Sequence, residues 1–391
     1  MSALVTETDL GSSAPHGAPA LPEANDRSFR EGAFGHARTL SCRECGHEVE
    51  LGPHYACPEC FGPLEVAYDF PVVTRAEIEA GPRNIWRYQA LLPVPADITE
   101  SPNTEPGFTR LLRADNLARE LGLDRLWVKD DSTNPTNSFK DRVVACALSA
   151  ARELGAKVFA CPSTGNLANA VAAAGARAGI KTVVFIPSNL ERPKQVNSAV
   201  YTENLVAVNG TYDDVNRLAS EIAGEQEGWA FVNVNVRPFY AEGSKTLGYE
   251  IAEQLGWRLP DQVVIPVASG SQLTKVDKAF RELIELGLVD DKPYRIFGAQ
   301  ATGCSPVAAA PTWSEMASRV FRPMPVLITT VSCAGSSWPV STSFLSTPMV
   351  VPPAVSVKIP SLRASSRMPS RTSSSVMSST VPPVRRQMSS T

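Results

Sequence analysis

The chain has 391 residues, of which 43% are hydrophobic and 20% charged, a composition typical of a globular protein with two or three domains. It contains no run of 18 apolar residues and no apolar block near its start. We therefore expect no membrane span, no secretory signal and, by default, a cytoplasmic location. Seven Arg, one Lys and one Glu give residues 311–391 a charge of +7, so residues 1–310 carry −10. This acidic body argues against broad nucleic-acid binding.

The four histidines all precede residue 55. Their position excludes a Ser-His-Asp or Cys-His catalytic system from the rest of the chain. Lys, Tyr, Ser, Asp, Glu or a cofactor must then move protons there.

Residues 1–37 are rich in Ala, Gly, Pro, Ser and Glu without periodicity, which predicts a disordered lead-in. Residues 38–68 contain two CxxC pairs that are separated by eleven residues: Cys42 with Cys45, and Cys57 with Cys60. Four thiolates at this spacing predict a structural zinc site in a zinc-ribbon-like segment. The alternative is a cysteine-bearing loop that has lost its metal. The nearby charges are mixed, which favours a stabilising or docking module over nucleic-acid binding.

Residues 108–300, within a domain that we place at residues 69–310, alternate β-branched runs with helical patterns, as expected for a mostly parallel sheet flanked by helices. This pattern predicts an α/β catalytic domain. The candidate strands are 126–129, 157–161, 182–186, 205–208, 230–234, 263–267 and 295–299.

Lys140 falls in the first turn of a predicted helix whose apolar residues recur with helical spacing up to Leu154. Ser138 and Asp141 have the spacing of a capping box. The positive end of the helix dipole and burial both disfavour an ammonium ion, and a neutral amine is what a Schiff-base lysine needs. The alternative is an exposed lysine that pairs with Asp141.

Two further turns join a predicted strand to a predicted helix and can hold an anion. The first contains Ser163, Thr164, Gly165 and Asn166. The second contains small or polar residues: Ala268, Ser269, Gly270, Ser271 and Gln272. Either turn alone is equally consistent with a routine helix cap. Because ligands of open parallel sheets gather at the carboxyl ends of strands, the two turns and Lys140 together predict a ligand site.

The motifs Asn137-Ser-Phe-Lys-Asp-Arg142, Ser163-Thr-Gly-Asn166 and Ala268-Ser-Gly-Ser-Gln272 together resemble the fold-type-II enzymes that use pyridoxal phosphate. Within that group, the chain resembles the threonine synthase family over residues 38–310, including forms that carry a cysteine-rich segment before the catalytic domain. The resemblance implies a two-lobed fold of open, mostly parallel sheets. It also implies conversion of O-phospho-L-homoserine and water to L-threonine and phosphate, and a homodimer.

By this resemblance, Lys140 binds the cofactor as a Schiff base and moves the substrate's protons, with the departing phosphate as an alternative base. Asn166 binds the 3′-oxygen of the cofactor, and the turn 268–272 binds its phosphate. Ser163, Thr164 and Gly165 bind the substrate carboxylate. The substrate phosphate is assigned to Ser244, Lys245 and Thr246.

Residues 311–391 contain 20 Ser and 11 Pro but one Gly, and six of the seven Met. One interpretation is a disordered basic tail. The interpretation that we favour is a shifted reading frame, which leaves the catalytic domain incomplete and its activity in question. The segment that supplies a hydroxyl to the cofactor's pyridine nitrogen in the family has no counterpart after residue 310.

Other functions compatible with these motifs are threonine dehydration and β-replacement on a phosphorylated serine analogue, as in cysteate synthase. A different class of function is a zinc-ribbon interaction protein with an inactive enzyme domain.

Overall fold

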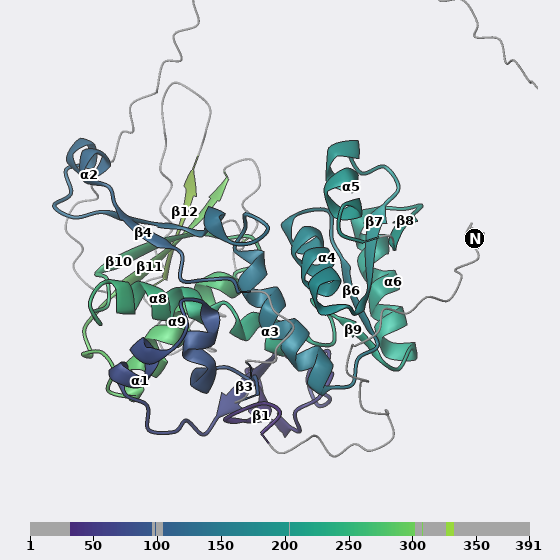
Figure 1. The fold of residues 1–391 in the computed structure, drawn as a ribbon, viewed down its shortest axis with the longest axis horizontal. Coiled ribbons are helices and arrows are strands. Elements are labelled where there is room, and N and C mark those ends of the chain that lie inside the picture. Colours follow the sequence, from purple (N-terminus) through teal and green to yellow (C-terminus); the bar gives the residue numbers. More distant parts are fainter. Residues whose placement is uncertain are drawn as a thin grey trace, which may run out of the picture.

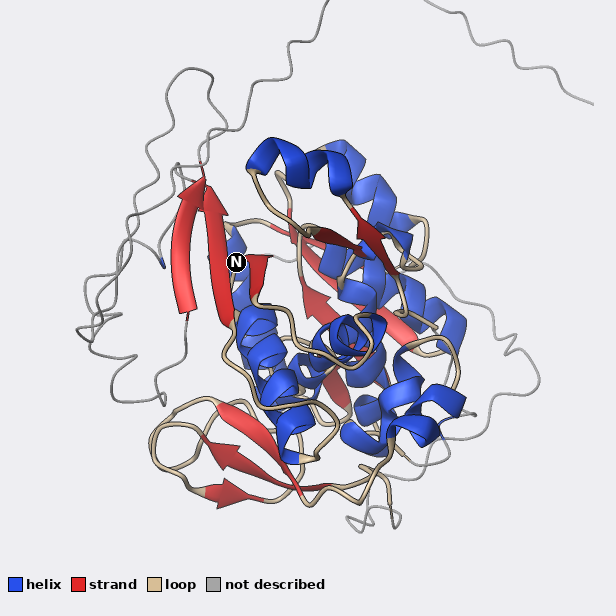
Figure 2. Ribbon diagram, turned by 90° about the vertical axis from the view of Figure 1, so that its left-hand side faces the viewer, coloured by secondary structure: helices blue, strands red, loops and turns tan. Residues whose placement is uncertain are grey.

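The computed structural model describes residues 32–95, 98, 105–202, 204–301, 307 and 326–331. In this part of the chain, two lobes built on parallel sheets lie on either side of a central helix, α3 (Lys140–Glu153) (Figure 1). A small antiparallel sheet from the start of the described chain lies at the bottom of the view in Figure 2. The predicted α/β class and the two-lobed arrangement of parallel sheets are confirmed.

The first lobe contains a four-stranded parallel sheet in the order β8-β7-β6-β9. Its two central strands are almost entirely buried, and their alternate side chains enter two different cores. Phe159 and Val184 pack on the α4 side, whereas Ala160 and Phe185 pack on the α6 side. The elements are β6 (Val158–Pro162), α4 (Asn166–Ala178), β7 (Lys181–Pro187), α5 (Arg192–Ala199), β8 (Leu205–Val208), α6 (Tyr212–Glu225) and β9 (Trp229–Phe231).

The second lobe contains the parallel sheet β10-β11-β12. Its core is closed by α8 and α9, and the buried residues of α9 recur at helical spacing from Leu273 to Leu283. The elements are β10 (Gln262–Pro266), α9 (Ser271–Glu285), β11 (Arg295–Ala301), β12 (Val326–Val331), α8 (Lys245–Gln254), α1 (Arg75–Ala80) and the 3₁₀ helix η1 (Ile85–Leu91).

Short elements connect the two lobes. The strands β4 (Arg110–Arg113) and β5 (Trp127–Asp130) form an antiparallel pair around α2 (Asp115–Leu121). The 3₁₀ turn η3 (Asp131–Thr133) then leads toward α3, and α7 (Arg237–Glu242) precedes α8. The candidate strand 126–129 therefore exists, but outside the parallel sheets.

The N-terminal sheet has the order β2-β1-β3 and is antiparallel: β1 (Ala37–Cys42), β2 (Glu48–Val49) and β3 (Leu64–Tyr68). We call residues 37–68 the cysteine ribbon. Leu40 and Val66 of its inner face are buried in the same core as α3 and α4. The ribbon is thus packed against the core that contains α3 and α4.

Two strands differ from the sequence predictions. The candidate strand 230–234 is shorter, because the chain turns after Phe231, whose carbonyl accepts hydrogen bonds from the amides of Val234 and Val236. Strand β12 lies within the segment predicted to be a low-complexity tail and pairs in parallel with β11. The rest of residues 311–391, like residues 1–31, lies outside the described residues.

Across the residues that the structure describes, no helix has both the length and the apolar character that crossing a membrane requires.

Candidate active site

Lys140 is the first residue of α3, at the junction of the two lobes. Phe139, directly before it, packs against the cores of both lobes. The Lys140 Nζ atom donates a hydrogen bond of 2.8 Å to the hydroxyl of Tyr240 on α7. Burial lowers the pKa of Lys140, and no carboxylate within the described residues contributes to the shift. The side chain is therefore a half-buried amine without a counter-ion in that part of the chain, and its lowered pKa favours the neutral form.

The loop before Lys140 is held differently from the predicted capping box. The N-cap residue is Phe139, which makes no side-chain cap. Ser138 Oγ accepts a 3.2 Å hydrogen bond from the Lys140 amide. The Asp141 carboxylate instead accepts hydrogen bonds from the amide and hydroxyl of Thr136, at 2.8 Å and 2.9 Å. Asp141 thus fixes the preceding loop and forms no ion pair with Lys140.

The turn between β6 and α4 opens toward solvent. Ser163 is buried and its amide donates to the Phe185 carbonyl, which continues the β6–β7 pairing for one more residue. Gly165 and Asn166 are exposed, and a Cβ added at Gly165 would meet no atom within 4 Å. Among the described residues, the Asn166 side chain has no hydrogen-bond partner. This turn therefore presents free polar groups at the N-terminus of a 13-residue helix.

The turn between β10 and α9 has a similar form. Gly270 is the N-cap residue of α9 and has a φ of +81°, the left-handed region that favours glycine. A Cβ at Gly270 would also meet nothing within 4 Å, and α9 has no side-chain cap. Ala268 and Ser269 are exposed, and Ser271 and Gln272 are half-buried. The N-terminus of α9 thus lacks a side-chain cap and borders open space, where an anion can accept hydrogen bonds from its first amides.

Lys245 is placed where it cannot bind a substrate phosphate. Its side chain is fully buried, and its Nζ lies 2.8 Å from both the Leu91 carbonyl and a Glu242 oxygen. A second carboxylate, Glu282, lies at 3.1 Å. Ser244 and Thr246 are buried with it. The structure therefore contradicts the predicted phosphate-binding role of these three residues, because two carboxylates already neutralise the ammonium group.

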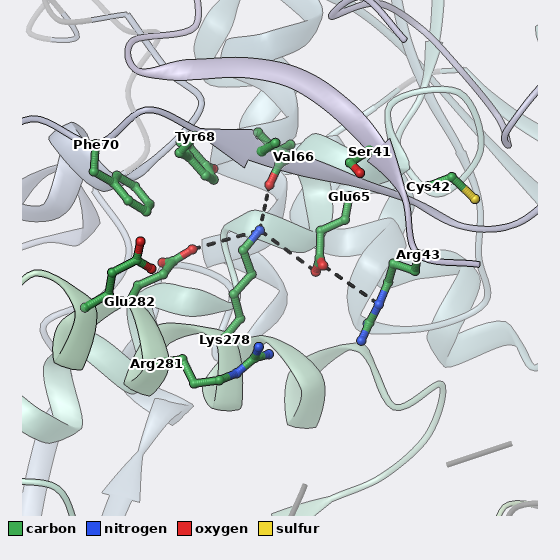
Figure 3. A pocket seen from close by; sticks show the side chains of 12 residues that line it. Ser41, Cys42, Arg43, Glu65, Val66, Tyr68, Phe70, Lys278, Arg281 and Glu282 are labelled. Carbon is green, nitrogen blue, oxygen red and sulfur yellow. Dashed lines mark hydrogen bonds and ion pairs between the residues drawn. The ribbon is translucent and has the colours of Figure 1, made fainter. Parts of the chain in front are cut away.

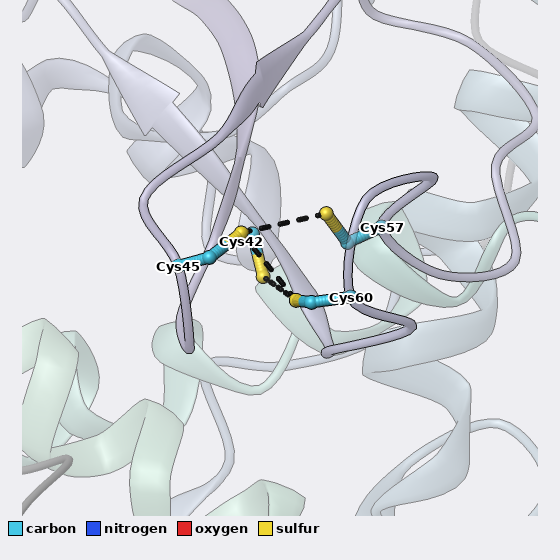
Figure 4. A group of neighbouring side chains, drawn as sticks. All are labelled: Cys42, Cys45, Cys57 and Cys60. Atoms are coloured by element: carbon cyan, nitrogen blue, oxygen red, sulfur yellow. Dashed lines mark hydrogen bonds between the residues drawn. The ribbon is translucent and has the colours of Figure 1, made fainter.

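The four cysteines of the ribbon form a cluster (Figure 4). The Sγ–Sγ distances are 3.5 Å for Cys42 and Cys60, 3.7 Å for Cys45 and Cys57, and 3.4 Å for Cys45 and Cys60. A tetrahedral site with Zn–S bonds of about 2.3 Å separates its sulfurs by about 3.8 Å. The cluster thus has the ligand type, number and spacing of a closed structural zinc site, with no position for a substrate.

A cavity of about 440 Å³ separates β1 and β3 of the ribbon from α9 (Figure 3). Lys278 of α9 donates a 2.8 Å hydrogen bond to the Val66 carbonyl and lies 3.1 Å from Glu242. Burial lowers the pKa of Lys278 to about 8, against the opposing effect of Glu242. Lys275 also binds Glu65 and Glu242. The cavity walls therefore belong to a charge network that joins the ribbon to α7 and α9.

Two features of the site were not predicted from the sequence. Tyr240 lies within the segment 235–246 used for the resemblance, but nothing in the sequence connects it to a lysine 100 positions away. Arg142, two residues after Lys140, is fully buried and binds Asp131 at 2.8 Å and Glu250 at 2.5 Å. The available signal in the sequence was that Arg142 belongs to the motif Asn137–Arg142, at the start of a predicted helix.

The family described as "Pyridoxal-phosphate dependent enzyme" matches residues 103–343. The chain belongs to this family. The threonine synthase of Methanosarcina acetivorans is 35% identical over 275 residues, which are 69% of this chain and 66% of that protein. The threonine synthase of Methanocaldococcus jannaschii is 34% identical over 274 residues, 69% of this chain and 67% of that protein. The chain thus spans about two thirds of the length of these relatives.

A solved structure, a threonine deaminase from T.th., is 25% identical, with a TM-score of 0.45. The similarity covers 64% of this chain and 71% of that chain.

The described residues fit the cofactor of the family. An aldehyde requires an uncharged amine, which the burial of Lys140 favours. A phosphate requires free amides and space, which the turn at Gly270 supplies. Asn166 offers an unpaired amide next to the β6–α4 turn.

Proposed function

We propose that this chain is a threonine synthase, which converts O-phospho-L-homoserine and water to L-threonine and phosphate. The observation that carries the proposal is the half-buried Lys140 amine at the junction of two lobes, without a counter-ion among the described residues. The name shared by the curated relatives supports the choice of reaction.

In this proposal, Lys140 Nζ holds the cofactor covalently, and the first amides of α9, at 270–272, bind its phosphate. The Asn166 amide binds the 3′-oxygen, while Ser163, Thr164 and Gly165 bind the carboxylate of the substrate. When bound, pyridoxal phosphate supplies an electron-accepting ring that stabilises negative charge on the substrate's carbon skeleton.

Lys140 also moves protons in this proposal. With the cofactor and substrate bound, Nζ would remove the proton from Cα of the substrate and would then serve the proton transfer at Cβ that precedes loss of the γ-phosphate. Burial lowers the pKa of this amine, which favours the unprotonated form that a base requires. The use of a single amine for successive proton transfers is consistent with a chain whose four histidines all precede residue 55.

We further propose that Cys42, Cys45, Cys57 and Cys60 hold a structural zinc ion, and that the enzyme works as a cytoplasmic homodimer. The sulfur spacing supports the metal.

Replacing Lys140 with Ala tests the function. We expect the unmodified protein to show the visible absorbance of bound cofactor and to form threonine and inorganic phosphate in equal amounts from phosphohomoserine. Lys140→Ala should lose both properties, because no amine remains to bind the aldehyde. Lys194→Ala, a change of an exposed lysine on α5, is the control and should retain both.

Borohydride reduction followed by peptide mapping locates the attachment point independently of activity. A label at any residue other than Lys140 contradicts the proposal. Formation of a keto acid and ammonia from threonine, with no threonine formed from phosphohomoserine, would identify a dehydratase instead. Salt-sensitive nucleic-acid binding by a catalytically inert protein would favour an interaction role for the ribbon.

A further inference from the structure

Tyr240 is 8% exposed, and its hydroxyl accepts the 2.8 Å hydrogen bond from Lys140 Nζ. Within the described residues the hydroxyl has no second partner. The ammonium of Lys140 likewise has no ion pair there. The two side chains, one on α3 and one on α7, therefore form an isolated pair at the junction of the lobes.

The surroundings of Tyr240 keep its phenol neutral. Burial raises the pKa of Tyr240, Cys161 of β6 and Tyr212 of α6 raise it further, and Arg237 of α7 lowers it. No carboxylate contributes from the described residues. A neutral phenol can accept a hydrogen bond from an ammonium ion and can donate one to an amine. It can therefore hold Lys140 Nζ in either protonation state, whereas a carboxylate would favour the charged state alone.

The helix that carries Tyr240 is fixed from its other end. Glu242, the last residue of α7, is fully buried and accepts a 2.7 Å hydrogen bond from Tyr68 of the ribbon. It also lies 2.8 Å from Lys245 and 2.5 Å from Lys275. These three side chains thus hold α7 in place, and with it the hydroxyl that faces Lys140.

We propose that Tyr240 is a positioning residue, which binds the Lys140 amine and keeps it in place while the amine transfers protons. When Nζ gains a proton from the substrate, the ammonium donates a hydrogen bond to the phenol oxygen. When Nζ releases that proton, the phenol O–H donates a hydrogen bond to the amine. Tyr240 begins and ends each transfer as a neutral phenol. This inference rests on the proposed role of Lys140 as the base.

The first experiment titrates Lys140 in cofactor-free protein by competitive acetylation with acetic anhydride, read by peptide mass spectrometry across pH. In the Tyr240→Phe variant, the Lys140 ammonium loses its hydrogen-bond acceptor, whereas the lysine side chain stays buried. Because a charge-assisted hydrogen bond is stronger than a neutral one, we expect the pH of half-maximal labelling to fall by about one unit. Tyr294→Phe, which removes a hydroxyl bound to Asp277, is the matched control and should leave this pH unchanged. An unchanged value in Tyr240→Phe overturns the inference.

The second experiment uses the enzyme with bound cofactor. Exchange of the α-hydrogen of L-amino acids with D₂O, followed by NMR, reports proton transfer whatever the natural substrate is. Tyr240→Phe should lower the maximal exchange rate by about 10- to 100-fold and change the half-saturating concentration less than twofold. Equal rates in the variant and the unmodified protein overturn the inference.

The outcomes separate the two proposals. If the unmodified protein exchanges α-hydrogen but forms no threonine, the proposed reaction fails, and the effect of Tyr240→Phe on exchange still decides the inference. If Tyr240→Phe does not fold, global incorporation of 3-fluorotyrosine replaces it. The more acidic phenol is a poorer acceptor and a better donor, so the pH of half-maximal labelling should again fall, and an unchanged value overturns the inference.

Discussion

Gly62 shows how closely the cysteine ribbon is fitted around its four sulfurs. A Cβ at this position would lie 2.8 Å from Cys42 Sγ, closer than Cβ atoms approach other atoms, and 3.1 Å from Cys60 Sγ, tighter than most Cβ contacts. Its φ is not positive, and the left-handed position of the second turn belongs to Phe61, with a φ of 57°. Gly62 is therefore needed for space, whereas Gly46, with a φ of +74°, is needed for backbone conformation.

This contrast predicts different metal contents for two substitutions. Gly62→Ala should abolish zinc binding, because the added methyl group displaces two ligands. Gly46→Ala meets no atom within 4 Å, so it should cost about 1–2 kcal/mol in stability and retain one zinc ion per chain. Elemental analysis of the purified proteins measures the difference. Equal zinc contents in the two variants would contradict the prediction.

At the scale of elements, α3 is held in place by a buried ion network beside its first turn. Arg142 binds Asp131 of η3 and Glu250 of α8, and Glu250 also binds Lys129 of β5 at 2.6 Å. Burial opposes the charge of Arg142, but Glu250 and Asp131 outweigh it and raise its pKa above the ordinary value. The network therefore ties both the β4–β5 pair and α8 to the helix that carries Lys140.

Removing one member of this network should be costly. Arg142→Met leaves the buried Glu250 carboxylate and the half-buried Asp131 carboxylate without their main partner, and should lower the free energy of unfolding by about 3–5 kcal/mol. The control is Arg217→Met, which removes an exposed ion pair with Asp214 on α6 and should cost less than about 1 kcal/mol. Urea unfolding of both variants measures the two values, and similar losses would show that the network is not structural.

For the whole molecule, the attachment of the ribbon depends on charge. Burial alone would raise the pKa of Glu65, but Lys275 and Lys278 of α9 outweigh it and hold the pKa at about 2. Because this pKa is lower in the folded state, the ionised carboxylate stabilises the protein above pH 4.5, its ordinary value. That stabilisation is lost as the pH falls from about 4.5 toward about 2.

Acid should therefore weaken the folded protein through this contact. Protonation of Glu65 should lower the free energy of unfolding by up to about 3 kcal/mol across that range. In Glu65→Gln the dependence on pH should be flatter by this amount, whereas Glu221→Gln, an exposed change on α6, should preserve it. Urea unfolding at several pH values provides the comparison, and parallel curves for Glu65→Gln and the unmodified protein would refute the interpretation.

Much of the fold could be predicted because its signals are local. The helical spacing after Lys140 and the β-branched runs of the first lobe located α3, β6, β7 and β8 to within one or two residues. The antiparallel pairing of β5 with β4 could not be predicted, because strand direction depends on a partner that is distant in the chain. The capping box did not form as predicted, because the Ser138 hydroxyl accepts from the Lys140 amide and the Asp141 carboxylate accepts from Thr136.

The sequence by itself determined the chemistry that the molecule can carry: a lysine at a helix start, two glycine-containing turns at strand ends, and four cysteines at metal-binding spacing. Tertiary structure alone decided which of these groups face a site. It buried Lys245 between two carboxylates and brought Tyr240 to Lys140 from 100 positions away. Spacing and periodicity are properties of neighbouring residues, whereas burial and hydrogen-bond partners are set by segments that meet only after the chain has folded.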